Sequence, residues 1–256
     1  MSAMGLLGGR VALVTGVSRR QGIGYAIASR LAGLGADLFV QHHVAHDASQ
    51  PWGADSVDEV LASIDGRVVG MGVDLADPDA PDQLMAAAVE AYGRVDVLVC
   101  NHARSGGDGP LGELTAEMID GHYAVNTRSS ILLAQAFVRQ WSGSTGGRIV
   151  FMTSGQDRGA MPSEVAYAAS KGALSSIVET LSYQLVGRGI TVNAVNPGPV
   201  DTGWAGPELN ELVRQKMPLG RWGQPDDPAR LISWLCTDDA AWITGEVINS
   251  EGGFRR

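Results

Sequence analysis

The sequence has few cysteines and no cluster of metal-binding residues. Cys100 and Cys236 are its only cysteines, and they stand far apart without the spacing of metal ligands. Because a cytosol keeps most thiols reduced, we expect both side chains to pack in the core. His42, His43 and His46 come close together, but neighbouring strand residues point to opposite faces and no carboxylate or thiolate completes a site. We therefore interpret this segment as a solvated loop and predict no metal.

Long apolar runs and positive charge are scarce as well. No run approaches the roughly 20 apolar residues that a membrane-spanning helix needs. The N-terminal segment MSAMGLLGGR has no basic leader followed by a long apolar stretch. We expect a cytoplasmic protein with no signal peptide and no membrane contact. A net charge of -9 also disfavours nucleic acid as a partner, because nucleic-acid surfaces need clustered Lys and Arg.

What the sequence does contain is a regular alternation of short apolar runs and helical patterns. Runs of strand length lie at 10–15, 37–41, 67–71, 95–100, 148–153, 190–195 and 246–249. Segments with helical spacing lie between them at 24–35, 82–93, 117–141 and 164–187. The alternation predicts a single α/β domain with a parallel, doubly wound sheet covered by helices on both faces. Residues that follow Val14, Val99 and Met152 should then meet at one ligand-binding edge.

The region 197–224 interrupts this alternation. It is rich in Gly and Pro around one short helical piece, and we expect a mobile flap over the substrate. Trp204, Met217 and Trp222 lie in it, and apolar substrate contact and plain packing are equally good interpretations of the three.

The first strand runs through TGVSRRQGIG directly into a helix. Gly16, Gly22 and Gly24 fall where the chain must turn tightly and approach a pyrophosphate, and Ser18 and Ile23 lie in the same turn. Backbone N–H groups at a helix start bind phosphates well. The segment therefore predicts a dinucleotide site.

The end of the second strand indicates which dinucleotide binds. A free ribose 2′-hydroxyl favours an Asp or Glu there, but the sequence has Gln41, His42 and His43. Arg19 and Arg20 in the glycine-rich turn carry guanidinium groups that match a 2′-phosphate. NADP(H) is therefore favoured over NAD(H).

Asp74 follows the third strand in VDLADP, next to Leu75. Its carboxylate can hydrogen-bond the amino group of adenine, or it can be an acid at a helix N-terminus before Pro78. The sequence does not decide between the two.

Tyr167 and Lys171 form the strongest candidate for catalysis. Pro162, Ser163 and Glu164 indicate a helix start with Ser163 as its cap, so a spacing of four places the phenol and the ammonium on one helix face. A phenol with a pKa near 10 is a poor acid–base group at neutral pH. We expect the charge of Lys171 to lower that pKa.

Ser154 follows the preceding strand, at the edge where a substrate oxygen would lie. Its hydroxyl either orients that oxygen for Tyr167 or caps its own turn. The neighbouring Tyr and Lys favour the catalytic interpretation.

Together, the glycine-rich turn, Asp74, VCNHA, Asn126, Ser154, the Tyr167 to Lys171 spacing and NPGPVDTG resemble the short-chain dehydrogenase/reductase family, in the family's order and over essentially the whole chain. The resemblance implies a single-domain Rossmann fold over 1–256 with seven parallel strands. It also implies a nicotinamide-dependent oxidoreductase acting on a small carbonyl or alcohol substrate, and a homotetramer, for which 117–141 and 164–187 are candidate contact faces.

The resemblance further implies residue roles. Tyr167 would be the general acid, Ser154 would position the carbonyl, Lys171 would bind the nicotinamide ribose and lower the tyrosine pKa, and Asn126 would hold a proton-relay water. Asn101 matches a structural Asn. The residues implied to bind cofactor are Gly16, Ser18, Arg19, Arg20, Gly22, Ile23, Gly24, His42, Asp74, Leu75, Asn101, Tyr167, Lys171, Pro197, Gly198, Val200 and Thr202.

Three features depart from the family pattern. Five residues separate Gly16 from Gly22 where three are usual, and His102 replaces the usual second Asn. The pattern is similar to 3-oxoacyl-acyl-carrier-protein reductases, yet no Lys or Arg follows Lys171 until Arg188, which disfavours an acidic carrier protein as partner. A non-catalytic NADP(H) sensor and another Rossmann enzyme such as a methyltransferase are the alternatives. The intact Tyr, Lys, Ser and Asn set disfavours both.

Overall fold

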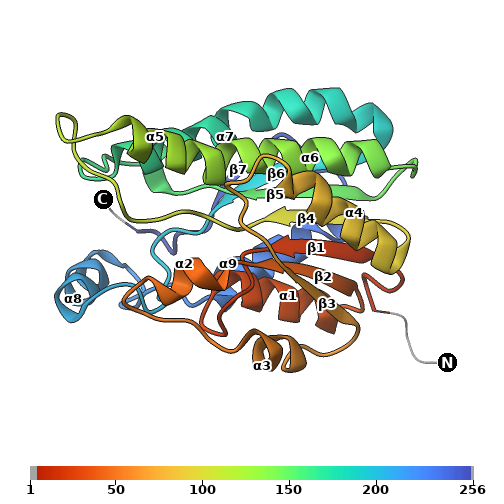
Figure 1. Ribbon diagram of the computed structural model, residues 1–256, viewed down its shortest axis with the longest axis horizontal. Coiled ribbons are helices and arrows are strands. Elements are labelled where there is room, and N and C mark those ends of the chain that lie inside the picture. Colours follow the sequence, from red (N-terminus) through yellow and green to blue (C-terminus); the bar gives the residue numbers. More distant parts are fainter. Residues whose placement is uncertain (1–4, 255–256) are drawn as a thin grey trace.

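A parallel sheet forms the centre of the molecule (Figure 1). The computed structural model describes residues 5–254, and its strands run in the order β3-β2-β1-β4-β5-β6-β7, all parallel. They are β1 (Val11–Thr15), β2 (Asp37–His42), β3 (Val68–Gly72), β4 (Val97–Cys100), β5 (Gly147–Met152), β6 (Ile190–Asn196) and β7 (Val247–Asn249). The predicted doubly wound fold and each of its seven strands are confirmed.

The central strands show why the sequence reads as unbroken apolar runs. β1, β4, β5 and β6 are buried at every position, as expected for parallel strands with helices on both faces. Val14 pairs with Val99, and Val99 pairs with Val150, so these neighbouring strands end at similar heights. Their carboxyl ends therefore deliver the residues that follow to one edge, as predicted.

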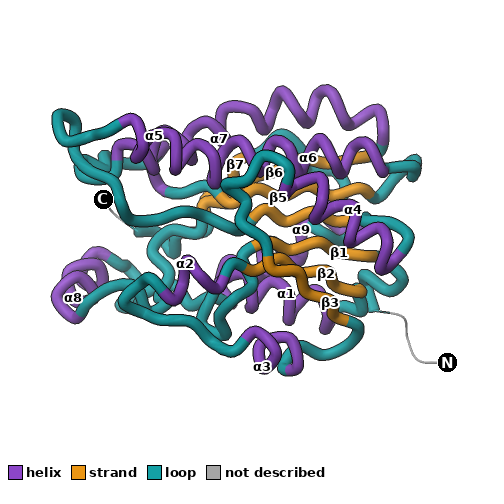
Figure 2. The backbone as a smooth tube through the Cα atoms, viewed as in Figure 1, coloured by secondary structure: helices purple, strands orange, loops and turns teal. Residues whose placement is uncertain are grey.

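Helices cover the sheet on two sides (Figures 1 and 2). One apolar core lies between the sheet and α1 and α9, and the other lies between the sheet and α4, α6 and α7. The helices are α1 (Ile23–Gly33), α2 (Val44–Ala48), α3 (Val57–Ala62), α4 (Ala80–Tyr92), α5 (Ala116–His122), α6 (Ser129–Gln140), α7 (Val165–Leu185), α8 (Pro207–Lys216) and α9 (Asp226–Leu235). Cys100 and Cys236 are buried, as expected.

Three helices differ from the sequence prediction. The segment after β2 is not a plain loop, because it contains α2 and α3, which are too short to show a clear period. α9 begins among Pro225 and Pro228, which resemble loop residues although proline is compatible with the first turn of a helix.

The predicted helix over 117–141 is interrupted. Between α5 and α6 the chain forms a π-helical segment, Tyr123–Arg128, which contains Asn126. Such segments insert an extra residue into a turn and often occur at functional sites. The apolar spacing continues through the segment, so no feature of the sequence indicates the interruption.

α8 lies away from the sheet in Figure 1. It occupies the middle of the region 197–224, whose role as a flap stays a prediction. Nowhere in residues 5–254 is there a helix with the length and apolar character that crossing a membrane requires.

Candidate active site

The glycine-rich turn brings β1 and α1 into very close contact. Gly16 has a φ of 73°, and a Cβ on Gly24 would lie 2.2 Å from the Gly16 carbonyl oxygen, so both positions need glycine. Asn101 donates from Nδ2 to the carbonyls of Thr15 (3.0 Å) and Gly16 (3.2 Å). The Asn101 side chain therefore fixes this turn, which fits the structural role that the family resemblance implied.

The two arginines of the turn are engaged by carboxylates. Arg19 Nε lies 3.1 Å from Asp47 Oδ1, and Arg20 Nη2 lies 3.2 Å from Glu59 Oε2. Asp47 also accepts a hydrogen bond from Ser18 Oγ at 2.5 Å. Asp47 lies on α2, far from the turn in sequence, and sequence reasoning missed it. The charge of Arg19 and Arg20 is thus already balanced within the protein.

Arg19 also links the turn to the segment after β6. Its Nη1 donates to the carbonyl of Thr202 at 3.1 Å, and its guanidinium lies 5.3 Å from the ring centre of Trp52. In the same segment, Gly198 has a φ of 64°, and a Cβ there would lie 2.8 Å from the Cα of Glu251. Pro197 to Thr202 is therefore held close to the glycine-rich turn, as a cofactor loop would be.

The end of β2 holds a structural glutamine and a partly buried histidine. Gln41 Oε1 accepts from the Gly16 N–H at 3.0 Å, and its Nε2 donates to Val73 O at 2.8 Å. Within residues 5–254, the buried Nδ1 of His42 has no hydrogen-bond partner. Burial, with the nearby charge of His43, lowers the pKa of His42, so it stays neutral at pH 7.

Asp74 does not begin a helix. Its Oδ1 accepts from the Ala76 N–H at 2.8 Å, and α4 begins only at Ala80, after Asp79. The interpretation as a helix N-terminal acid is therefore wrong, because a turn of several residues separates Asp74 from the helix. Leu75 beside it is buried.

Lys171 is a buried ammonium at the carboxyl edge of the sheet. Its side chain is 2 % exposed, and Nζ donates to the carbonyl of Met152 at 2.9 Å. Burial lowers its pKa to about 8. Nζ lies 6.0 Å from the ring centre of Tyr167, one helical turn away on α7. The predicted neighbourhood of the two side chains is present.

The phenol of Tyr167 behaves differently from the prediction. Burial raises its pKa to about 12, a hydrogen bond with Ser154 opposes this rise, and the charge of Glu164 adds to it. Lys171 does not lower the pKa of Tyr167 as expected, because the effect of burial dominates and the Lys171 ammonium donates a hydrogen bond to the Met152 carbonyl instead. Tyr167 is therefore a protonated hydroxyl at neutral pH.

Ser154 reaches Tyr167 because it lies two residues after Met152, which ends β5. It stands at the N-terminus of a short 3₁₀ turn, Gly155–Asp157, and within the described chain its hydroxyl does not cap that turn. The hydroxyl is instead hydrogen-bonded with Tyr167. The alternative of a turn-capping serine is not supported.

Asn126 is fully buried in the π-helical segment. Its Oδ1 accepts from the Arg104 N–H at 2.7 Å, and its Nδ2 donates to Arg104 O at 3.2 Å and to Ser170 Oγ at 2.9 Å. The amide thus ties the loop after β4 to α7. Both its N–H groups are used by the protein, so a relay water is restricted to the remaining oxygen lone pair or to the backbone.

Asp108 is a neighbour of Tyr167 that sequence reasoning missed. Its carboxylate accepts from the backbone N–H of Gly109 (2.8 Å), Ala166 (3.0 Å) and Tyr167 (2.7 Å). Burial opposes its ionisation, but these backbone donors prevail and lower its pKa. The prediction that Ser163 caps the helix is wrong, because α7 starts at Val165 and Asp108, from another loop, accepts hydrogen bonds from its first N–H groups. The segment GGDGPL looks like an ordinary turn and gave no signal.

His102 fills the place of the usual second Asn with three contacts. Its Nδ1 lies 2.7 Å from Thr15 Oγ1, and its Nε2 lies 2.9 Å from Val125 O and 2.7 Å from Ser129 Oγ. Burial lowers its pKa to about 3, so the ring is neutral. A neutral ring with its proton on Nε2 serves all three partners and connects β1 with the π-helical segment.

The apolar residues of the 197–224 region divide into two kinds. Met217 and Trp222 are buried, and Trp222 Nε1 donates to Asn210 O at 2.9 Å, which favours packing for these two. Trp204 packs edge-to-face on Trp222 with 5.8 Å between ring centres and remains 47 % exposed. Trp204 alone keeps both interpretations open.

The arrangement fits a nicotinamide dinucleotide. In the described chain α1 begins at Ile23, and its N-cap residue Gly22 supplies no side-chain cap, which leaves backbone N–H groups of the first turn for phosphate. The hydroxyls of Ser154 and Tyr167 lie on the same edge. Residues 5–254 bring together no three His, Cys, Asp or Glu side chains able to hold a metal ion. A neutral phenol, a serine and an ammonium at this edge can donate a proton and orient a carbonyl oxygen.

Known proteins resemble the chain over nearly its full length. A family model described as enoyl-(acyl carrier protein) reductase matches residues 16–255. The uncharacterized oxidoreductase YjdA of Bacillus subtilis (strain 168) is 43 % identical over 249 residues, which are 96 % of this chain and 97 % of YjdA.

Two solved structures share the fold. A short-chain dehydrogenase from Burkholderia cenocepacia J2315 in complex with NADP is 35 % identical, with a TM-score of 0.85 over 96 % of this chain and 98 % of its own. LugOII, a promiscuous reductase that catalyses keto-reduction at C1 during lugdunomycin biosynthesis, is 38 % identical, with a TM-score of 0.84 over 96 % and 98 %. The chain therefore belongs to the short-chain dehydrogenase/reductase family of oxidoreductases.

Proposed function

We propose that the protein is an NADP(H)-dependent oxidoreductase that transfers hydride between nicotinamide and a carbonyl or secondary alcohol. The observation that carries the proposal is the meeting of Ser154, Tyr167 and Lys171 at the edge where the glycine-rich turn lies. The relatives support it, since one was solved with NADP and another performs keto-reduction. A 3-oxoacyl substrate remains one candidate within this class.

In this mechanism the bound nicotinamide supplies or accepts the hydride. Ser154 holds the substrate oxygen beside the Tyr167 hydroxyl, and Tyr167 donates its proton to that oxygen as the alcohol forms. The raised pKa of Tyr167 suits this direction, because the phenol is protonated at neutral pH. Lys171 places a positive charge one turn away, and Asn126 holds the loop after β4 against α7.

The decisive experiment is Tyr167→Phe. We expect the variant to lose turnover by roughly 100-fold or more, because general acid catalysis typically contributes 10²–10⁴-fold. Cofactor binding, measured by fluorescence titration with NADPH, should stay close to that of the wild type. Unchanged turnover would remove Tyr167 from the mechanism, and cofactor binding without turnover in the wild type would favour a non-catalytic sensor.

Cofactor choice is tested separately. We expect steady-state reduction of a carbonyl panel to run several-fold faster with NADPH than with NADH, because the end of β2 carries His42 rather than an acid. A clear preference for NADH would contradict this part of the proposal and leave the catalytic residues untouched.

The homotetramer also remains a proposal. Tyr183 and Val186, at the end of α7, expose their apolar side chains and could form part of a subunit contact.

A further inference from the structure

Three arginines lie near the glycine-rich turn and the loop after β4, and they differ in their partners. Arg19 is paired with Asp47, and Arg20 is paired with Asp55 and Glu59. The guanidinium of Arg104 has neither an ion pair nor a hydrogen bond with any residue from 5 to 254. Its charge is therefore not balanced by the part of the chain that the structure describes.

Arg104 is nevertheless held firmly. Its backbone N–H and C=O are both bonded to the Asn126 amide, at 2.7 and 3.2 Å. Its guanidinium lies against Gly121 of α5, where a Cβ would come within 2.3 Å of Nη1, and a Cβ on Gly107 would lie 3.4 Å from Nη2. Gly121 thus leaves space for the half-buried guanidinium of Arg104, while the Arg104 backbone is hydrogen-bonded to Asn126.

The surroundings of Arg104 connect the two halves of the site. The loop after β4 passes α2 on its way to α5 (Figure 1), and Gly106 approaches the side chain of Gln50 just beyond α2. Burial lowers the pKa of His46 on α2, and the charges of His43, Arg104 and Arg19 lower it further, whereas the charge of Asp47 raises it. Four residues beyond Arg104, Asp108 binds the Tyr167 N–H. The Arg104 charge thus acts on α2, and the Arg104 backbone is bonded to Asn126.

We propose that Arg104 binds an oxyanion, a phosphate or carboxylate group, within the site of the proposed function. A half-buried guanidinium gains most from a planar or tetrahedral oxyanion, because its fork of N–H donors can bind two oxygens at once. Two sources supply this chemistry: the 2′-phosphate of the cofactor, and an acidic group on the carbonyl substrate.

The experiment compares Arg104→Gln with the wild type on matched probes. Calorimetry measures the affinity for 2′,5′-ADP, which carries the 2′-phosphate, and for 5′-AMP, which lacks it. Steady-state kinetics with NADPH measure kcat/KM for a keto acid and for its methyl ester. We expect the affinity or kcat/KM for at least one charged probe to fall about 10-fold or more, as for the loss of a charge-assisted hydrogen bond. The matched uncharged probe, 5′-AMP or the methyl ester, should change little.

Two further variants control for folding. Gly121→Ala should displace the guanidinium while Arg104 keeps its backbone bonds to Asn126, and should reproduce the selective loss. Arg67 precedes β3 at the opposite edge of the sheet and pairs with Asp37 at the surface, so Arg67→Gln removes the same charge away from the site. It should change neither the ratio of the affinities for 2′,5′-ADP and 5′-AMP nor the ratio of kcat/KM for the keto acid and its ester. Thermal melts of all variants show whether they are folded.

The outcomes separate the sources. A loss confined to 2′,5′-ADP assigns the cofactor phosphate, and a loss confined to the keto acid assigns the substrate. Equal losses on charged and uncharged probes, or no loss at all, overturn the inference. If the wild type reduces carbonyls with NADPH while Arg104→Gln behaves like it throughout, the inference fails and the proposed function stands.

Discussion

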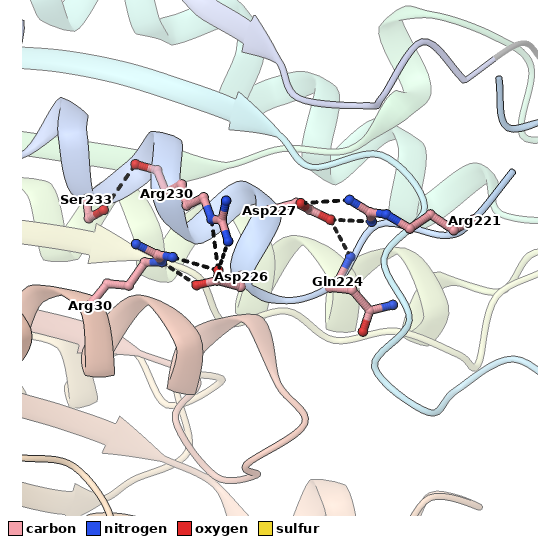
Figure 3. Close-up of polar contacts among 7 residues, drawn as sticks. All are labelled: Arg30, Arg221, Gln224, Asp226, Asp227, Arg230 and Ser233. Carbon is pink, nitrogen blue, oxygen red and sulfur yellow. Dashed lines mark hydrogen bonds and ion pairs between the residues drawn. The ribbon is translucent and has the colours of Figure 1, made fainter. Parts of the chain in front are cut away.

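The N-termini of α7 and α9 are both held by aspartate, but in opposite ways. At α9 the acids belong to the helix itself: Asp226 pairs with Arg30 of α1 and with Arg230, and Asp227 pairs with Arg221 (Figure 3). At α7 the acid comes from a separate loop, since Asp108 binds the backbone N–H groups of Ala166 and Tyr167. The start of α9 is held mainly by side-chain pairs at the surface, with one backbone bond from Gln224, whereas the start of α7 is held through its backbone N–H groups beside the site.

The difference shows what each aspartate controls. The Arg30 hydrogen bond, opposed by burial and helped by Arg230, lowers the pKa of Asp226 to about 2, yet its side chain is 42 % exposed. Its partners join two helices on one face of the sheet. Asp108 instead sets where the first turn of α7 stands, and so where the Tyr167 phenol lies. We therefore expect Asp226 to affect stability and Asp108 to affect chemistry.

The largest effect is expected for Asp108→Ala. Losing the carboxylate frees two N–H groups of α7 and allows Tyr167 to move, and a displacement of about 1 Å can cost about 100-fold in rate. We expect kcat to fall roughly 10- to 100-fold and the free energy of unfolding to fall by about 1–2 kcal/mol, as for a lost N-cap. Steady-state kinetics and denaturant titration measure the two.

Two companions sharpen this result. Asp108→Asn keeps an oxygen for Gly109 and Ala166 but turns an N–H₂ group toward Tyr167, so its activity should be intermediate. Asp226→Ala alters the other helix start and should leave kcat unchanged. If Asp226→Ala reduced kcat as much as Asp108→Ala, the distinction between the two helix ends would be wrong.

The sequence could predict what depends on local spacing. The strands follow from their apolar runs, Lys171 lies near Tyr167 because four residues make one helical turn, and Gly24 is needed where helix and strand converge. Asp108 acts on a residue 59 positions away, and His102 reaches Ser129 across 27 positions. Only the fold brings such pairs together. The high pKa of Tyr167 arises from burial, which no spacing reveals.

The second effect concerns stability at α9. Asp226→Ala removes the pairs with Arg30 and Arg230, which are partly solvated, so we expect a loss of about 1 kcal/mol in the free energy of unfolding. That corresponds to a fall in Tm of roughly 2–4 °C for a chain of this size. Scanning calorimetry measures it, and added salt should shrink the difference. A gain in stability on mutation would show that the free-energy cost of desolvating these charges exceeds the free energy gained from their pairing.

This contribution has a predictable pH window. The folded-state pKa of Asp226, about 2, lies below its ordinary value of 3.8, so ionised Asp226 favours the folded state. The stabilisation should be complete above about pH 4 and disappear as the pH falls toward 2. Wild type and Asp226→Asn, compared by denaturant titration from pH 6 to 2, should therefore converge in acid. A difference that persists at pH 2 would contradict the role of the ionised carboxylate.

The smallest effect should come from Arg221→Gln. Arg221 makes a forked pair with Asp227 at 2.6 and 3.1 Å, but half of its side chain is exposed, and exposed pairs contribute only about 0.2–1 kcal/mol. Asp227 also accepts from the Gln224 N–H at 2.7 Å, a bond that survives the loss of Arg221. Asp227→Ala removes both contacts and should destabilise the protein more than Arg221→Gln in the same melting experiment. Equal losses would mean that the arginine, rather than the backbone bond, holds this end of α9. The contrast with Asp108 would then widen, because every hydrogen bond that the Asp108 carboxylate accepts from residues 5–254 comes from a backbone N–H group.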